Sequence, residues 1–182
     1  MKIIEIQEKT VPISSEIQNA YINFKKMDCS VVAIKTDVKK DGKFITGYGF
    51  HSNGRYAVSE LLTKRFMPRL KESKEEDVLN NEGDNFSPEK IWKILMKNEK
   101  PGGHGERSTA VGAIDMAIWD IVSKIENVPL YEYLAKKYGD GTFKNKIFVY
   151  AAGGYYYPGK DIQMLQDEMK SYMDLGFTTV KM

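Results

Sequence analysis

A glycine-rich segment with one histidine is the stretch of this sequence best suited to chemistry. Residues 101–108 read PGGHGERS and precede a run with helical periodicity. Glycines let a backbone approach a ligand closely, and the amino terminus of a helix favours anions. His104 lies among these glycines, and an imidazole can donate or accept a proton near neutral pH. An exposed histidine in a flexible turn is the alternative, and the residue types leave both interpretations open.

Two asparagines have side chains that could bind hydroxyl or carboxylate groups. Asn53 lies in HSNGRY, residues 51–56, where an Asn-Gly pair can equally hold a tight left-handed turn. Asn19 lies in the polar and aromatic segment 14–28, and irregular segments of that length are usually functional or mobile. For either residue taken alone, a solvated polar loop is the plainer interpretation.

Lys181 differs from these residues because of the element that would carry it. In FTTVKM, Phe177, Thr179 and Lys181 share one face of a strand. A lysine at the carboxyl end of a parallel barrel strand faces the site that such folds place there, and desolvation lowers a lysine pKa toward values that suit proton abstraction. A lysine that simply emerges at a strand end is the more common case, so both interpretations stay open.

The amino-terminal elements predict an antiparallel sheet. Residues 2–8 alternate apolar and polar, and 30–37 and 44–50 are two further β-type runs. Asp41-Gly42 between the last two runs is a good hairpin signal. We therefore expect a sheet of about three strands.

Helical patterns follow the sheet. They lie at 61–66, at a start signal formed by Ser87-Pro88, at 108–126 and at 130–138. In the third of these, apolar residues recur at three- and four-residue steps, which makes it the clearest helix of the chain. The first is expected to close near Pro68, because proline interrupts a helix.

The last part of the chain follows another pattern. Residues 146–152 read as a strand, 161–175 as an amphipathic helix and 177–182 as a second strand. Strand, helix and strand with these spacings form a βαβ unit, normally a right-handed crossover in a parallel sheet. One βαβ unit cannot bury both faces of a parallel sheet. We therefore expect an α+β domain over 1–140, followed at 141–182 by the start of a larger domain.

Composition excludes several classes of protein. The 182 residues include 27 Lys and Arg against 25 Asp and Glu, a net charge of +2 with both signs interleaved, which favours neither nucleic acid nor a membrane as partner. Hydrophobic residues make up 42% of the chain, which excludes a disordered protein. The lone Cys29 cannot form an intramolecular disulfide, and no run has the pattern of a signal peptide or a membrane span. We expect a cytoplasmic protein.

Taken in order, several motifs resemble one known family. GGHGERSTAVGAIDMAIWD, FVYAAGGYYYPGK and TTVKM follow the predicted three-stranded sheet. In this arrangement the chain resembles the mandelate racemase/muconate lactonizing branch of the enolase superfamily, over essentially its whole length. Within that branch the motifs SSEIQNAY, GYGFHSNGRY, NEKPGGHGERS and AAGGYYYPGK are most similar to D-tartrate dehydratases. The resemblance implies that 1–140 is a capping domain and that 141–182 begins a truncated (β/α) TIM-like barrel.

The resemblance also implies a reaction. Members of this branch abstract a proton α to a carboxylate and stabilise the enediolate on Mg²⁺. Loss of the β-hydroxyl as water would then convert tartrate to oxaloacetate. Lys181 matches the first lysine of a Lys-x-Lys pair and would bind and neutralise the substrate carboxylate. Asn19, Asn53 and His104 would bind substrate from the capping domain, and the loop of residues 155–157 would add a tyrosine contact that the sequence leaves unassigned.

The rest of that machinery is expected outside residues 1–182. It comprises the general base at position 183, the general acid and the Mg²⁺ ligands, so no metal ligand is expected within this chain and the chain alone is expected to be inactive. The expected partners are a small hydroxy-acid substrate and, for the complete protein, further copies of itself in a homo-oligomer. Two alternatives stay open: a racemase, epimerase or other sugar-acid dehydratase of the same superfamily, and a non-catalytic α+β binding module.

Overall fold

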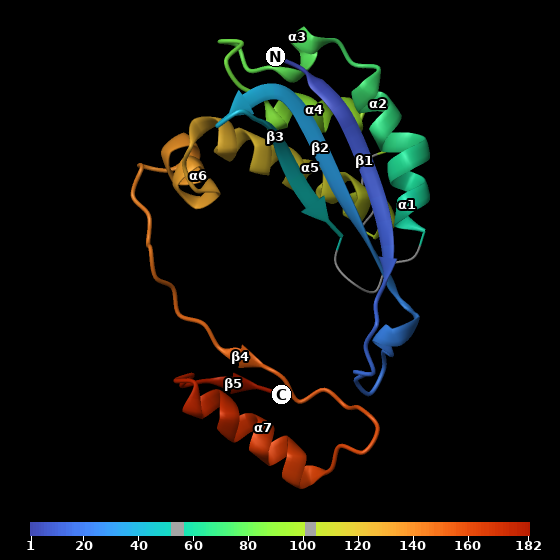
Figure 1. The fold of residues 1–182 in the computed structure, drawn as a ribbon, viewed down its shortest axis with the longest axis vertical. Helices are drawn as coiled ribbons and strands as arrows, with labels where there is room; N and C mark the ends of the chain where they lie inside the picture. Colours follow the sequence, from blue (N-terminus) through green and yellow to red (C-terminus); the bar gives the residue numbers. More distant parts are fainter. Residues whose placement is uncertain (52–56, 101–104) are drawn as a thin grey trace. The chain divides into compact units, whose positions relative to one another are not determined.

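The fold is taken from a computed structural model that describes residues 1–51, 57–100 and 105–182 (Figure 1). The chain divides into two compact units. The first unit comprises Met1–Val11 and Asp28–Phe143, and the second comprises Pro12–Met27 and Lys144–Met182. The predicted domains at 1–140 and 141–182 stay a prediction, and the two units are described separately below.

The first unit contains the predicted three-stranded sheet. Its strands are β1 (Ile3–Pro12), β2 (Asp28–Lys40) and β3 (Lys43–Phe50), in the order β1-β2-β3 (Figure 1). Strands β2 and β3 are antiparallel and meet at the turn, where Lys40 pairs with Lys43. Asp41 and Gly42 both have positive φ, 50° and 76°, as a tight hairpin turn requires. The predicted hairpin is confirmed.

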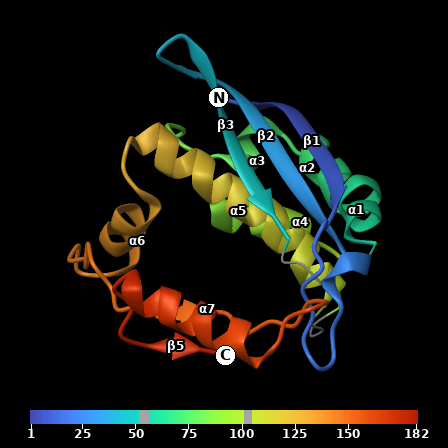
Figure 2. The same cartoon turned by 60° about the horizontal axis from the view of Figure 1, so that its bottom comes forward.

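Helix α5 (Glu106–Glu126) crosses one face of this sheet (Figure 2). Its approach is unusually close because two positions of β3 have no side chain. A Cβ atom on Gly47 would lie 2.0 Å from the Ala117 carbonyl oxygen, and one on Gly49 would lie 2.0 Å from that of Ala113. The FITGYGF run therefore uses its glycines for helix–sheet packing.

The first helical segment is longer than the sequence predicts. Helix α1 (Val58–Leu61) continues through a π-helical turn (Leu62–Phe66) into α2 (Met67–Lys71). The expectation that it closes near Pro68 is wrong. Pro68 stands in the first turn after the π-helical segment, and wide turns of that kind absorb interruptions of the regular hydrogen-bond ladder.

Three further helices belong to the first unit. They are α3 (Glu75–Val78), α4 (Pro88–Leu95) and α6 (Leu130–Tyr138). The predicted start of α4 is confirmed, because the Ser87 hydroxyl accepts a hydrogen bond from the Lys90 N–H, with proline at the next position. Buried apolar side chains from the sheet and from the helical segments before α6 form one cluster that includes Val32, Ile34, Leu62, Phe66, Phe86, Ile91, Leu95, Ile114, Ile118 and Ile121.

The second unit holds the predicted βαβ elements in a shortened form. Strands β4 (Ala151–Ala152) and β5 (Val180–Lys181) pair in parallel, and α7 (Ile162–Asp174) lies between them in sequence. Segment Pro12–Met27 adds a 3-10 turn at Phe24–Lys26. Paired β-structure thus covers two residues per strand in place of the predicted 146–152 and 177–182.

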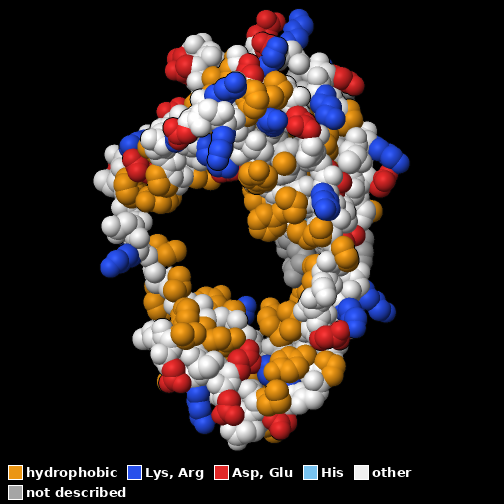
Figure 3. Space-filling model, in the orientation of Figure 1, with side chains coloured by type: hydrophobic (Ala, Val, Ile, Leu, Met, Phe, Trp, Pro, Cys, Tyr) orange, Lys and Arg blue, Asp and Glu red, His pale blue; other side chains and the backbone are white. Residues whose placement is uncertain are grey.

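Apolar side chains remain at the surface of both units (Figure 3). In the second unit they include Ile147, Phe148, Ile162, Leu175 and Met182, each more than 70% exposed. Among the described residues, no helix combines the length and the apolar character needed to span a bilayer.

Candidate functional site

The predicted site residues fall into two groups. Asn19 and Lys181 both belong to the second unit. Asn53 and His104 lie outside the described residues, so their predicted roles stay predictions. Asn19 and Lys181 are thus the predicted site residues whose surroundings the structure describes.

Lys181 is held by its backbone, while its side chain is exposed. It stands opposite Ala152 in the parallel pair, and its carbonyl oxygen accepts a hydrogen bond from the Gly153 N–H at 2.9 Å. The strand is the element predicted to carry this lysine. This arrangement fixes the Cα of Lys181 while its flexible stem leaves the ammonium group able to reach a ligand.

The side-chain oxygen of Asn19 accepts hydrogen bonds from its own loop. The oxygen Oδ1 accepts hydrogen bonds from the backbone N–H groups of Tyr21 (2.8 Å) and Ile22 (2.7 Å), and the Asn19 N–H donates to the Ile22 carbonyl (2.9 Å). These bonds close a tight turn of the kind that asparagine favours. A ligand contact by Asn19 would therefore use its amide nitrogen.

The Asn19 loop is joined to the tyrosine loop, residues 155–157. Gln18 and Tyr156 exchange two backbone hydrogen bonds, each 2.8 Å long. The rings of Phe24 and Tyr155 meet edge to face, with 5.9 Å between their centroids. The two loops, far apart in sequence, form one local structure in the second unit. Sequence reasoning proposed both loops as candidate site elements and did not predict that they touch.

The sequence also did not predict a charged cluster that contacts the tyrosine loop. Glu168 of α7 forms an ion pair with Lys160 and accepts hydrogen bonds from the Tyr172 hydroxyl (2.9 Å) and the Gly154 N–H (3.2 Å). The hydrogen bond from Lys160 lowers the pKa of Glu168, and the hydrogen bond to Glu168 raises the pKa of Tyr172. The carboxylate is therefore ionised at neutral pH.

In the first unit, a buried carboxylate, that of Glu99, precedes the undescribed segment 101–104 in the sequence. The side chain of Glu99 is 2% exposed and contacts Arg65 (2.8 Å), Arg69 (2.9 Å) and Arg107 (3.6 Å). Arg107 also donates to the Lys100 carbonyl at 2.9 Å. Burial alone would raise the pKa of Glu99, but the arginines outweigh it and lower that pKa. The cluster joins both sides of the segment that contains His104.

The end of β3, next to Asn53, carries a buried histidine. His51 is 1% exposed, and its Nε2 lies 3.8 Å from Oδ1 of Asp28. The Cys29 thiol donates to the His51 carbonyl (3.2 Å). Burial, together with the nearby Asp28 charge, raises the pKa of Cys29, so this thiol stays protonated at neutral pH. We interpret these contacts as structural support for the strand end.

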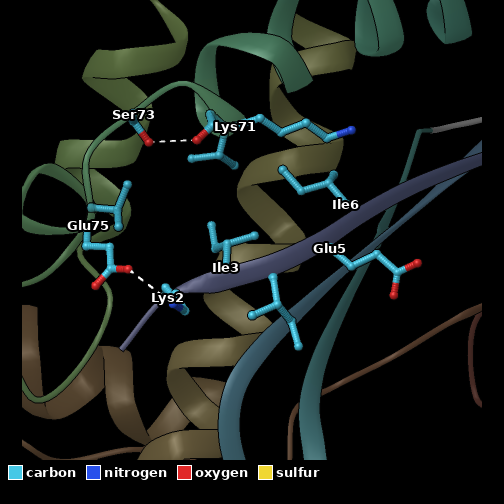
Figure 4. A pocket seen from close by; sticks show the side chains of 10 residues that line it. Lys2, Ile3, Glu5, Ile6, Lys71, Ser73 and Glu75 are labelled. Atoms are coloured by element: carbon cyan, nitrogen blue, oxygen red, sulfur yellow. Dashed lines mark hydrogen bonds and ion pairs between the residues drawn. The ribbon is translucent and has the colours of Figure 1, made fainter.

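One pocket of the first unit contains none of the predicted site residues. It measures about 580 Å³ and lies between β1 and the α2–α3 region of the first unit (Figure 4). Its floor is apolar, with Ile3, Ile6 and Leu70, and an ion pair between Lys2 and Glu75 (3.7 Å) crosses its rim. The Lys2 and Glu75 side chains are 55% and 59% exposed, so these charges lie in water and not in the enclosed surroundings typical of a catalytic site.

The chain was compared with known families, sequences and solved structures. No protein-family model matches the sequence. A mandelate racemase/muconate lactonizing enzyme-like protein from Rubrobacter xylanophilus has a TM-score of 0.65 at 20% identity, over 98% of this chain and 43% of its own. The fold is that of the amino-terminal part of the mandelate racemase/muconate lactonizing enzymes. An enolase from Bradyrhizobium in complex with magnesium and mandelic acid matches with a TM-score of 0.66 at 18% identity, over 98% of this chain and 44% of its own.

Two curated proteins with this level of sequence similarity to the chain are dehydratases. An arabinonate dehydratase of Saccharolobus solfataricus is 33% identical over 94 residues, 51% of this chain and 24% of the relative. A D-mannonate dehydratase of Rhizorhabdus wittichii is 29% identical over 143 residues, 75% of this chain and 30% of the relative. The chain therefore spans about a quarter to a third of the length of these curated relatives.

Proposed function

We propose that this chain is the amino-terminal part of an acid-sugar dehydratase of the enolase superfamily. The observation that carries the proposal is the 33% identity to an arabinonate dehydratase, found in a chain whose fold matches mandelate racemase/muconate lactonizing enzymes over 98% of its length. A fold alone hosts many reactions, and a partial sequence match alone does not define an architecture. Together they favour a hydro-lyase acting on a hydroxy acid.

In this proposal Lys181 binds the substrate carboxylate. Its ammonium group offsets the negative charge that grows on that carboxylate as the neighbouring carbon loses its proton. Asn19 contributes its amide nitrogen, and Asn53 and His104 bind the remaining hydroxyl and carboxylate groups. The general base belongs at position 183, next on the same strand face as Lys181.

Magnesium is the proposed cofactor, supported by the magnesium complex of the Bradyrhizobium enzyme. Among the described residues, however, no group of three or more His, Cys, Asp or Glu side chains could hold a metal ion. The described part of this chain therefore does not fit a magnesium site, and we derive no step through the metal. We propose that its ligands come from outside residues 1–182.

For the substrate we propose D-tartrate, on the motifs NEKPGGHGERS and AAGGYYYPGK. Arabinonate and mannonate are the competing substrates, because the matched relatives carry those names. A racemase or epimerase is less well supported, since both relatives are dehydratases. A homo-oligomer and a cytoplasmic location stay part of the proposal.

A substrate panel tests the function together with the role of Lys181. The polypeptide that joins residues 1–182 to a complete barrel is assayed with Mg²⁺ and D-tartrate, arabinonate, galactonate or mannonate, and keto-acid product is measured. We expect product from at least one acid, and Lys181→Met should lower kcat/KM by about 100-fold or more.

Lys170→Met is the matched control, because Lys170 is an exposed lysine of α7 whose pair with Asp167 is 3.8 Å long. It should leave kcat/KM unchanged. No product from any acid would contradict the dehydratase proposal. Full activity of Lys181→Met would remove Lys181 from the site and leave the reaction class standing.

A further inference from the structure

The carboxylate of Glu168, which the proposed reaction does not use, contacts three parts of the second unit. Oε2 forms the ion pair with Lys160, and Oε1 accepts from Tyr172 and from the Gly154 N–H. The Lys160 and Glu168 side chains are 5% and 26% exposed. Because removing such charges from water is costly, a pair of this kind is stable only when further hydrogen bonds satisfy it, as they do here.

Lys160 uses its charge within the tyrosine loop. Besides the ion pair, its ammonium donates to the Tyr155 carbonyl at 2.8 Å and lies 5.1 Å from the centre of the Tyr157 ring. The loop is thus anchored near its start by Glu168, through Gly154, and in its middle by Lys160. A substrate carboxylate would have to displace Glu168 to reach this lysine, so Lys160 is a poor candidate for substrate binding.

The same carboxylate is packed against the strand pair that carries Lys181. A Cβ atom on Gly153 would lie 2.6 Å from both Oε1 of Glu168 and the Tyr172 hydroxyl oxygen. The Gly153 N–H donates to the Lys181 carbonyl. Glycine at position 153 therefore lets α7 place its carboxylate close to the residue whose N–H donates to the Lys181 carbonyl.

At its other side the anchored loop holds the Asn19 segment. Tyr155 contacts the Phe24 ring, and the reciprocal bonds between Gln18 and Tyr156 join the two backbones. Asn19 follows Gln18 directly. Contacts among described residues therefore lead without a break from Lys181, through the 153–160 loop, to Asn19.

We propose that Glu168, with Lys160, is a positioning pair that holds the Asn19 loop in register with the strand end at Lys181. The pair acts through the 153–160 loop and does not itself touch substrate. The substrate contacts of Asn19 and Lys181 rest on the proposed function. The contact by which the 153–160 loop holds the Asn19 loop does not depend on it.

Amide hydrogen exchange of the 182-residue chain tests the positioning without requiring activity. Glu168→Gln removes the charge, leaves Lys160 without its partner and should raise the exchange rates of the Gln18 and Tyr156 amides by about tenfold or more. Amides in the middle of α7 and in the sheet of the first unit should keep their protection. A general loss of stability would raise all of these rates together, so the selective pattern is what identifies positioning.

Asp167→Asn is the matched control, since Asp167 neighbours Glu168 on α7, is 60% exposed and contacts Lys170 and Gln163. It should leave the Gln18 and Tyr156 amides within about twofold of wild type. Lys160→Met removes the other member of the pair, keeps an aliphatic side chain and should repeat the selective effect. If Glu168→Gln does not fold, Lys160→Met provides the test. Unchanged exchange at both amides in the folded variants would overturn the proposal.

Turnover separates this inference from the proposed function. In the polypeptide with a complete barrel, Glu168→Gln should raise KM for the acid sugar more than it lowers kcat. If exchange rises as expected while KM stays unchanged, the pair does hold the loop, and it is the substrate contact of Asn19 that fails.

Discussion

Asn19 and Lys181 differ in how much of each side chain the fold already uses. Asn19 has its carbonyl oxygen committed to two backbone N–H groups, whereas the contacts of Lys181 are made by its backbone. The loop geometry limits Asn19 to a donor role, which suits a hydroxyl or a carboxylate oxygen of a substrate. The ammonium group of Lys181 suits a carboxylate. Both assignments agree with a hydroxy-acid ligand.

At the same scale, Glu89 is the residue with the largest departure of pKa in the described chain. Burial alone would raise the pKa of Glu89, but the ion pair with Lys137 (2.8 Å) and the hydrogen bonds donated by Tyr138 and Ser87 lower it to about 2, from an ordinary value of 4.5. These contacts fasten α6 to the start of α4. Because the pKa is lower in the folded state, Glu89 stabilises the fold above pH 4.5, and this contribution is lost as pH falls toward 2.

Urea unfolding between pH 6 and pH 2 should reveal this contribution of Glu89. We expect the free energy of unfolding of the wild type to fall more steeply below pH 4.5 than that of Glu89→Gln, because the variant has no proton to gain at this position. Glu60→Gln removes an exposed carboxylate paired with Lys64 and should follow the wild-type curve. Parallel pH curves for Glu89→Gln and wild type would contradict the assignment.

Among the elements, those with local signals were predictable from the sequence. The Asp41-Gly42 turn and the Ser87-Pro88 start of α4 were predicted correctly, because each depends on the conformational preferences of two neighbouring residues. Helix α5 was predicted within two residues at its start, since its apolar stripe repeats over five turns. The strands β4 and β5 are shorter than predicted. Each of these strands pairs with the other over only two residues. The apolar pattern of 146–152 indicates which residues favour burial and does not determine how many of them pair with another strand.

The charged clusters could not be predicted in the same way. Glu99 meets its arginines from the π-helical turn, α2 and α5, and Glu168 meets Lys160 and Gly154 from a loop. Contacts between different elements, or between a loop and a helix, leave no periodic signal in one sequence. The sequence held one weak signal for Glu168. Lys160 ends the motif AAGGYYYPGK, and an acidic residue on the helix that follows could pair with it.

The packing of α5 on β3 gives a prediction for an element contact. Gly49→Ala should lower the free energy of unfolding by about 1–3 kcal/mol, because the new Cβ has no room against the Ala113 carbonyl. Gly112→Ala is the matched control. Gly112 lies within α5, and apart from its chain neighbours and the nearby backbone of α5 no atom lies within 4 Å of the new Cβ, so the variant should gain about 0.5–1 kcal/mol from helix propensity. Chemical denaturation measures both, and equal stabilities for the two variants would show that the close packing is not needed.

At the scale of the whole molecule, we propose that residues 1–182 bind a hydroxy acid, and no metal-ligand cluster occurs among the described residues. The chain spans less than half of the crystallised proteins that share its fold. In this proposal residues 1–182 recognise the substrate, and residues outside them abstract the proton with the help of Lys181. The 182-residue chain alone is accordingly expected to be inactive.

Solvent deuterium exchange at the carbon next to the substrate carboxylate tests this account most directly, because it reports proton abstraction whichever group leaves afterwards. The acid-sugar panel is incubated in D₂O with Mg²⁺ and followed by proton NMR, once with the polypeptide that includes a complete barrel and once with the 182-residue chain. We predict loss of the α-proton signal, or product labelled from solvent, with the longer polypeptide and no change with the chain alone. An α-proton retained in every acid with the longer polypeptide, or exchanged by the 182-residue chain alone, would contradict the account.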